Sequence, residues 1–191
     1  MSNTRAAEQE IDIYTCPSAP ESPSFQPSHY VGVAGAGRNG YAKDLEDSVC
    51  GDYYTDGMLY PQSKVTGAHI RDGQSNSLLV GEQPNSQPVF RRTWIEGAFW
   101  VGSVETRVCM NSTKNVRWPI NGSPETFGYL GAVTPPGKKK MLMNDATYSS
   151  FHPGGAYFVF ADGHVEMLTN DIDLECLKHL ATINGKEVIC P

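Results

Sequence analysis

The stretch FHPGGAYFVFADGHVEML, residues 151–168, decides the fold because two apolar segments in it are joined by Asp162-Gly163. An Asp-Gly pair between such segments is a strong signal for a β-hairpin with a two-residue type I′ turn. That turn sets the register, so Phe160 is expected to oppose Val165. One face of the predicted hairpin is then wholly apolar and belongs in the core: Phe158, Phe160, Val165 and Met167.

The opposite face of the hairpin is mixed and suits a partly exposed surface: Tyr157, Val159, Ala161, His164, Glu166 and Leu168. We interpret Asp162 as a turn residue and His152, which precedes a proline, as a structural residue that donates a hydrogen bond to a loop carbonyl. A shared metal or acid–base role for His152, Asp162 and His164 is disfavoured, because an extended strand would separate the first two by roughly 25 to 30 Å. The sequence is therefore predicted to hold no catalytic residue and no metal ligand.

Further strands are expected upstream of this hairpin. HYVGVAGAG (29–37) is rich in β-branched residues and glycine, and HIRDGQSNSLLVGEQ (69–83) places a turn at Asp72-Gly73 before a buried strand. The aromatic stretch FRRTWIEGAFWVGSVETRVCM (90–110) predicts one or two more strands.

The carboxyl-terminal segment TNDIDLECLKHLATINGKEVIC (169–190) predicts a short helix with Thr169 or Asn170 as its N-cap, followed by a closing strand at 186–190. Its inward residues are expected to be Ile172, Leu174, Leu177 and Leu180. Three carboxylates crowd the start of this helix: Asp171, Asp173 and Glu175. We interpret them as partners of the helix dipole, and a calcium site stays open as the alternative.

Length and composition favour one domain over residues 1–191, with few helices, many short strands and long loops. The chain has 191 residues, including 19 glycines and 13 prolines. Residues 36–66 and 111–148 are expected to be loop-rich surface insertions. Residues 1–10 resemble the end of a helix, and we interpret them as the remnant of an N-terminal helix whose apolar part is absent from this sequence.

Charge excludes nucleic acid as a partner. The formal net charge is -6, and the only basic run is Lys138-Lys139-Lys140, so the chain offers no basic surface for a phosphate backbone. No apolar run in the sequence is long enough to cross a bilayer.

The five cysteines are scattered without a Cys-x-x-Cys pair, which argues against a zinc ribbon and against a thioredoxin-like motif. We expect dispersed disulfides with at least one free thiol. Buried free cysteines in a cytosolic protein are the alternative.

Four landmarks occur in order along the chain: Cys-Pro-Ser at 16–18, Tyr-Val-Gly-Val-Ala-Gly at 30–35, Asp-Gly-x-Ser-Asn-Ser-Leu-Leu-Val-Gly-Glu at 72–82, and Leu-Ala-x-x-Asn-Gly-x-Glu-Val-Ile at 180–189. In addition, His152 is followed after nine residues by Asp162-Gly163. Together these features resemble a bacterial secreted family of unknown function, with a prepilin-type N-terminus and a C-terminal His-x9-Asp-Gly signature. The signature residues, for which a structural role is expected, are His152, Asp162, Gly163, Asp72, Gly73, Ser75, Asn76 and Glu82.

The resemblance implies an α+β fold that is pilin-like or pseudopilin-like, with an antiparallel sheet, long loops and one short C-terminal helix. It also implies an exported protein of the cell envelope, held in the inner membrane or in a fibre by an N-terminal apolar helix that this sequence lacks. The implied partners are other pilin-like subunits or envelope proteins, and the resemblance brings neither an enzymatic activity nor a cofactor.

The leading hypothesis is thus a non-enzymatic structural or interaction subunit of a pilus-like or type II secretion-like assembly. The alternative is an extracytoplasmic module that binds a solute or glycan, with Trp94, Trp100 and Trp118 as candidate stacking residues. A hydrolase is the least supported class, because the sequence contains neither G-x-S-x-G nor H-E-x-x-H.

Overall fold

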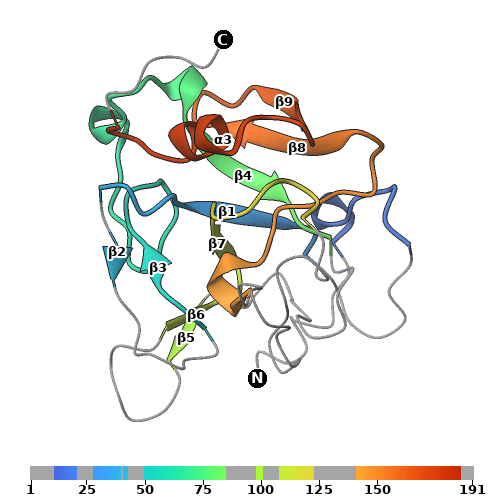
Figure 1. Cartoon of the computed structure of the whole chain (residues 1–191), viewed down its shortest axis with the longest axis horizontal. Helices are drawn as coiled ribbons and strands as arrows, with labels where there is room; N and C mark the ends of the chain where they lie inside the picture. Colours follow the sequence, from blue (N-terminus) through green and yellow to red (C-terminus); the bar gives the residue numbers. More distant parts are fainter. Residues whose placement is uncertain are drawn as a thin grey trace.

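The computed structural model describes residues 11–20, 28–39, 41–42, 50–84, 98–100, 108–122 and 141–185. Within these ranges the protein has an α+β fold, as the sequence predicts. A five-stranded sheet carries the helix α3 (Leu174–Leu180), and two small two-stranded sheets lie to one side of it (Figure 1). The predicted helix remnant at 1–10 and the predicted closing strand at 186–190 lie outside the described residues.

The main sheet has the strand order β7-β1-β4-β8-β9. Its strands are β1 (Tyr30–Gly35), β4 (Leu78–Glu82), β7 (Thr113–Asn115), β8 (Gly155–Phe160) and β9 (Val165–Thr169). Three of its four pairings are antiparallel, as predicted, whereas β7 runs parallel to β1. The sheet is therefore mixed, and the parallel pairing was not predicted.

The small sheets pair β2 (Tyr41–Ala42) with β3 (Tyr53–Tyr54), and β5 (Ala98–Trp100) with β6 (Val108–Met110). The pair β5 and β6 confirms the prediction of one or two strands within residues 90–110. Four single turns of 3-10 helix complete the described elements: η1 (Asp12–Tyr14), η2 (Gly67–His69), η3 (Gln74–Asn76) and η4 (Met143–Asp145). None of the helices in the described ranges has the length and apolar run needed to cross a bilayer.

The predicted hairpin forms, but its register differs by one residue from the prediction. Gly163 donates its N–H to the Phe160 carbonyl, and Phe160 donates its own N–H to the His164 carbonyl, both at 3.0 Å. Gly163 has a φ of 92°. This is a three-residue loop that combines a type I turn with a glycine bulge, rather than the predicted type I′ turn.

The extra loop residue moves every side chain of β9 to the other face. Val165 pairs with Val159 and Met167 pairs with Tyr157, on the face away from the core. The prediction that Val165 and Met167 are core residues is therefore wrong: they are 60% and 37% exposed. Leu168, which was expected on the mixed face, is buried instead.

The core lies between α3 and the inner face of the sheet. Leu177 of α3 is fully buried against a cluster that includes Val31, Val33, Leu78, Phe158 and Phe160. The cap of α3 differs from the prediction, because Asp173 and not Thr169 or Asn170 accepts a hydrogen bond from the N–H of Cys176, at 3.0 Å. The predicted caps are instead part of the end of the hairpin, where Asn170 donates its N–H to the carbonyl of Gly154.

The expectation that residues 111–148 are a surface loop is wrong for the described ends of that stretch. One end contributes β7 to the main sheet, and the other buries Asn144 and Asp145. Asn144 accepts a hydrogen bond from the N–H of Met110 and donates one to the Val108 carbonyl. Its side-chain amide thus makes the hydrogen bonds to the backbone of β6 that a neighbouring strand would otherwise make. The polar composition suggested exposure, but these polar groups are buried because each has a hydrogen-bond partner.

The described cysteines confirm the expected mixture of disulfides and a free thiol. Cys50 is bonded to Cys109 of β6, and Cys176 is also disulfide-bonded. Among the described residues, Cys16 is the free cysteine, and it is buried.

Candidate functional site

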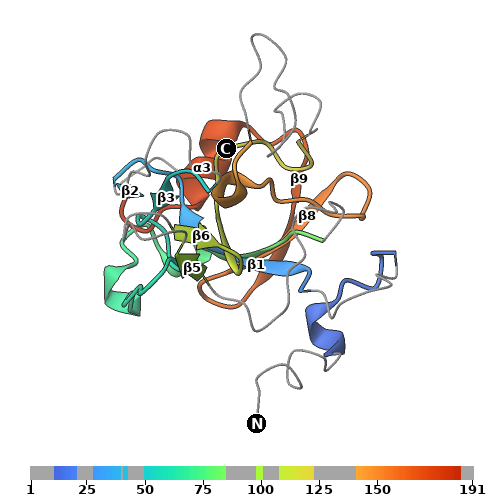
Figure 2. The same cartoon turned by 90° about the horizontal axis from the view of Figure 1, so that it is seen from below.

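Three segments that are far apart in the sequence meet at one end of the main sheet. They are the turn after η1, the last residue of β4 and the segment that leads into β8, and they bring together Cys16, Glu82 and His152. Residues 11–20 lie beyond the start of β1, close to the loop before β8, in both views of the fold (Figures 1 and 2). Of the described residues, this trio is the group of potential metal ligands whose donor atoms all lie within 4.8 Å of one another.

Backbone pairing explains how Cys16 reaches this place. His29, just before β1, donates its N–H to the carbonyl of Tyr14 at 2.8 Å. The Nδ1 atom of His29 accepts the N–H of Cys16, also at 2.8 Å. Pro17 follows, and the N–H of Ala19 closes a turn onto the Cys16 carbonyl at 3.0 Å. The thiol is thus fixed relative to the start of β1.

Glu82 and His152 are positioned by the sheet itself. Glu82 pairs with Tyr30 across β1 and β4, and its Oε2 accepts the N–H of Tyr157 in β8 at 2.8 Å. His152 lies edge-on to the ring of Tyr157, with the ring centroids 5.2 Å apart. Its backbone N–H donates to the hydroxyl of Ser150 at 3.1 Å.

The three side chains converge on a single atom, Nε2 of His152. The Cys16 Sγ lies 3.6 Å from this nitrogen, and the Glu82 Oε1 lies 3.7 Å from it. Cys16 and Glu82 are 3% and 2% exposed, whereas the His152 side chain keeps 28% of its surface accessible. The trio therefore lies just beneath the surface, with the imidazole on its solvent side.

The electrostatics of the trio keep the thiol protonated at neutral pH. Burial raises the pKa of Cys16, and the Glu82 carboxylate adds to the rise, while hydrogen bonds from the backbone N–H groups of Ser18 and Ala19 oppose it. Burial also raises the pKa of the neighbouring Tyr30, with further contributions from Cys16 and Glu82. A protonated thiol is a weak nucleophile.

The arrangement does not match a catalytic relay of cysteine, histidine and carboxylate. In a relay the imidazole uses one nitrogen for the nucleophile and the other for the carboxylate. Here both Cys16 and Glu82 approach Nε2, while Nδ1 lies 3.4 Å from the Ser18 hydroxyl. A sulfur, a carboxylate oxygen and an imidazole nitrogen lie close together instead, and such a group of atoms can hold a cation.

The other signature residues gather at the opposite end of β8. Asp162 accepts hydrogen bonds from the N–H and the imidazole of His164, at 3.1 and 2.6 Å, and from the hydroxyl of Ser75. Asp72 accepts the N–H of Gly185 at 2.6 Å. Asn76 donates its amide to the Asp72 carbonyl at 3.1 Å. These contacts join η3, the hairpin turn and the segment after α3, and they leave Asp162 apart from His152.

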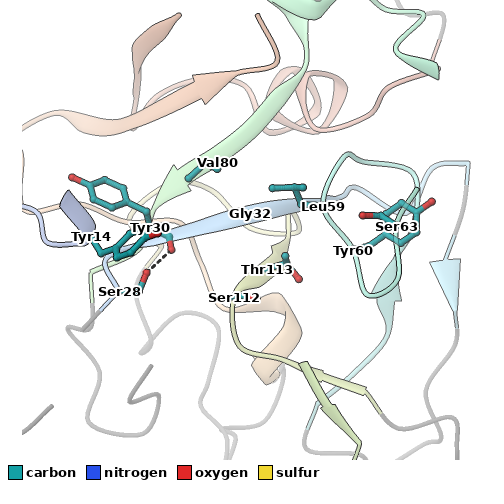
Figure 3. A pocket seen from close by; sticks show the side chains of 10 residues that line it. All are labelled: Tyr14, Ser28, Tyr30, Gly32, Leu59, Tyr60, Ser63, Val80, Ser112 and Thr113. Atoms are coloured by element: carbon teal, nitrogen blue, oxygen red, sulfur yellow. Dashed lines mark hydrogen bonds between the residues drawn. The ribbon is translucent and has the colours of Figure 1, made fainter. Parts of the chain in front are cut away.

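A groove of about 410 Å³ runs along the outer face of β1. Gly32 and Val80 lie in its floor, Tyr14 and Tyr30 stand at one end, and Leu59 and Tyr60 stand at the other (Figure 3). Aromatic rings in a groove are suited to stacking on sugars or other organic ligands.

The predicted stacking tryptophans do not line this groove within the described residues. The half-buried Trp118 packs instead beneath the guanidinium of Arg117, which lies 5.5 Å from its ring centroid. Trp94 and the side chain of Trp100 lie outside the described part of the chain.

The carboxylates that suggested calcium have protein partners. Asp173 caps α3, and Glu175 pairs with Lys178 at 2.7 Å and with Arg38. A hydrogen bond from the Thr169 hydroxyl lowers the pKa of Asp171. Of these contacts, the cap by Asp173 is the one that involves the start of the helix, as the helix-dipole interpretation expects.

Sequence reasoning did not group Cys16, Glu82 and His152, although each lies in one of the landmark segments. Cys16 opens Cys-Pro-Ser, Glu82 ends the 72–82 block, and His152 begins the His-x9-Asp-Gly spacing. The sequence did contain one indication of a metal site: each of these three segments begins or ends with a residue type that binds metals. Their separation in the sequence hid the fact that they meet.

Comparison with curated proteins and with solved structures gave no significant match. A family described as "Protein of unknown function (DUF1559)" matches residues 1–175, which is most of the chain and includes all three residues of the trio. The protein therefore belongs to the DUF1559 family.

Proposed function

We propose that the protein is a non-enzymatic, exported structural or interaction subunit of a pilus-like or type II secretion-like assembly in the cell envelope. Its interaction surface is the outer face of β8 and β9, which packs against a neighbouring pilin-like subunit. The observation that carries this proposal is that the exposed face of β8 and β9, at one edge of the main sheet, is apolar.

The surface consists of paired apolar side chains. Tyr157 and Met167 are directly opposite each other and are 40% and 37% exposed, and the neighbouring pair places Val165, 60% exposed, opposite Val159. β9 is the last strand in the order of the main sheet. Exposed apolar patches and sheet edges are where soluble domains meet partners. An uncharged patch of this kind fits another apolar protein surface.

Two further observations support the proposal. Disulfides form and persist in oxidising compartments, and the bonds at Cys50–Cys109 and Cys176 suit a location outside the cytoplasm. The approach of both Cys16 and Glu82 to one nitrogen of His152 argues against a thiol hydrolase, because such an enzyme uses one imidazole nitrogen for the thiol and the other for the carboxylate.

Site-specific photo-crosslinking tests the proposed surface. A photo-crosslinkable amino acid at Val165, in cells that produce the protein, is expected to give a discrete adduct with a pilin-like envelope protein. The same amino acid at Lys64, an exposed residue outside both strands, is the matched control and is expected to give none. Cell fractionation in the same experiment locates the protein.

A protein that is found free in the cytoplasm, or that gives no adduct at Val165, would contradict the proposal. A Val165→Lys variant provides the second test, because a charge in the middle of the patch is expected to release the protein from its assembly without lowering its Tm.

The groove favours the alternative function, a module that binds a solute or glycan outside the cytoplasm. Its specific support is the set of three tyrosines, Tyr14, Tyr30 and Tyr60, around one concave surface. The alternative predicts that an oligosaccharide raises the Tm of the purified protein and that Tyr30→Ala removes this increase. The subunit proposal predicts no such increase.

A further inference from the structure

We propose that Cys16, Glu82 and His152 form a zinc-binding site, in which the thiolate sulfur, one carboxylate oxygen and Nε2 of the imidazole coordinate one Zn²⁺ ion. The fourth position is taken by a water molecule on the exposed side of His152. The inference does not depend on the proposed role in the cell envelope.

The separations between the donor atoms fit a tetrahedral ion. Bonds of ~2.3 Å to sulfur and ~2.0 Å to nitrogen place these two atoms about 3.5 Å apart in a tetrahedral site. The observed distance from the Cys16 Sγ to the His152 Nε2 is 3.6 Å. Two bonds of ~2.0 Å place nitrogen and oxygen about 3.3 Å apart, and the observed distance from Nε2 to the Glu82 Oε1 is 3.7 Å. An ion therefore fits after shifts of a few tenths of an ångström.

Each ligand is already oriented by a second contact. The Ser18 hydroxyl lies 3.4 Å from Nδ1 of His152, where it can accept the proton that must reside on Nδ1 when Nε2 binds a metal. The N–H of Tyr157 holds Oε2 of Glu82, which directs Oε1 toward the trio. The backbone of Cys16 is held by its own N–H, which donates to Nδ1 of His29 at 2.8 Å.

Charge supplies an argument that is independent of distance. Glu82 is 2% exposed, and within the described part of the chain no lysine or arginine pairs with it. Its Oε1 lies 3.7 Å from Nε2 of His152, and a cation held between these two atoms would supply the positive charge that a buried carboxylate needs. One Zn²⁺ would neutralise the carboxylate and the thiolate together and leave the site without net charge.

The donor set selects the metal. Calcium and magnesium prefer sites built from oxygen alone, whereas a mixture of thiolate, imidazole and carboxylate suits Zn²⁺. Zinc also has no redox chemistry of its own. Its coordination would therefore protect the thiol from oxidation without creating a new oxidant beside it.

The test is a titration of the purified, tag-free protein with Zn²⁺ in competition with a chromophoric chelator. The wild type is expected to bind one Zn²⁺ per chain. Cys16→Ser and His152→Gln are each expected to weaken binding by more than about 100-fold, because loss of a direct ligand should exceed the 10- to 100-fold cost of losing a supporting contact. Ser18→Ala is expected to weaken it by about 10-fold.

His164→Gln is the matched control. His164 also lies beside carboxylates, 2.6 Å from Asp162 and 3.8 Å from Glu166. It has no thiol in its group, so this variant is expected to bind Zn²⁺ like the wild type. Equal affinities of the wild type and Cys16→Ser would overturn the proposal, and so would a loss of binding in His164→Gln.

A measurement on the unaltered protein covers the case in which the variants fail to fold. Co²⁺ in place of Zn²⁺ is expected to give the near-ultraviolet charge-transfer band of a cobalt–thiolate bond, together with the visible bands of a tetrahedral ion. Bound Zn²⁺ is also expected to block alkylation of Cys16 until a chelator is added. Co²⁺ that binds without the thiolate band, or alkylation that Zn²⁺ does not slow, would refute the site whatever the crosslinking result at Val165.

Discussion

Asp162 and its partners form a turn in which an exposed carboxylate is held by three hydrogen bonds. The N–H of His164 lowers the Asp162 pKa the most, and the hydroxyl of Ser75 and the imidazole of His164 contribute further, so that the pKa falls to about 2. The folded pKa lies below the ordinary value of 3.8, so the folded state favours the charged carboxylate. This stabilisation is fully present above the ordinary pKa and is lost as the pH falls through the folded pKa.

An Asp162→Asn variant is therefore expected to be less stable than the wild type at neutral pH. The difference is expected to shrink below about pH 5 and to vanish near pH 1, below the folded pKa of Asp162. Urea unfolding over this pH range measures the difference. Glu166→Gln controls for the loss of a negative charge near His164. A difference that stays constant down to about pH 2 would show that the hydrogen bonds to the charged carboxylate are not its source.

At the same scale, the sequence indicates the position of Asp162 in a turn but not the contacts of His152. Asp162 is defined by its neighbours in the chain, because an Asp-Gly pair between two strands makes a turn. The partners of His152 are a thiol from position 16 and a carboxylate from position 82, and no local pattern predicts that these meet. The backbone pairing of β1 with β4 and of His29 with Tyr14 brings them together.

Among the elements, β8 and β9 form a hairpin that the local sequence pattern predicts, although the pattern does not predict its register. The hairpin and its approximate bounds follow from the sequence. Its register does not, because Asp-Gly suits both a type I′ turn and a type I turn with a glycine bulge. Choosing between them exchanges the two faces of β9, and that choice determines whether Val165 is in the core or on the surface. The parallel β7 was missed for a related reason: three residues carry too little periodicity to define a strand.

The packing of β4 against β8 depends on the absence of a side chain at Gly81. A Cβ atom there would lie 2.4 Å from the ring of Phe158 and 2.7 Å from the ring of Tyr148. Gly81→Ala is therefore expected to lower the free energy of unfolding by about 1 to 3 kcal/mol, which is the usual cost of overpacking. Chemical denaturation measures this loss.

Gly67→Ala is the matched control, because the nearest atom to its added Cβ is 3.4 Å away, at the end of the Gln74 side chain. Its expected effect is within about 0.5 kcal/mol. The combination of Gly81→Ala with Phe158→Leu is expected to recover part of the loss. Equal stabilities of Gly81→Ala and Gly67→Ala would contradict the packing argument.

For the whole molecule, the disulfide Cys50–Cys109 connects the small sheet of β5 and β6 to the segment before β3. The bonded cysteines are 59 residues apart in the sequence. Closing a loop of that length lowers the entropy of the unfolded chain and is worth about 4 kcal/mol.

The Cys50→Ala/Cys109→Ala double variant is expected to lose about this amount of unfolding free energy. Equilibrium denaturation measures it, and counting the reactive thiols of the unfolded variant confirms that the bond at Cys176 is intact. A loss below about 1 kcal/mol would show that the unfolded chain is already restricted around this loop.

The meeting of residues 16, 82 and 152 also has a consequence for biogenesis. Position 16 precedes the histidine that helps to enclose its thiol by 136 residues of sequence. Until the last strands join the sheet, this thiol can exchange with bonds that should not include it. The folded arrangement encloses the thiol of Cys16, so we expect exchange at position 16 to slow once β8 has joined the sheet.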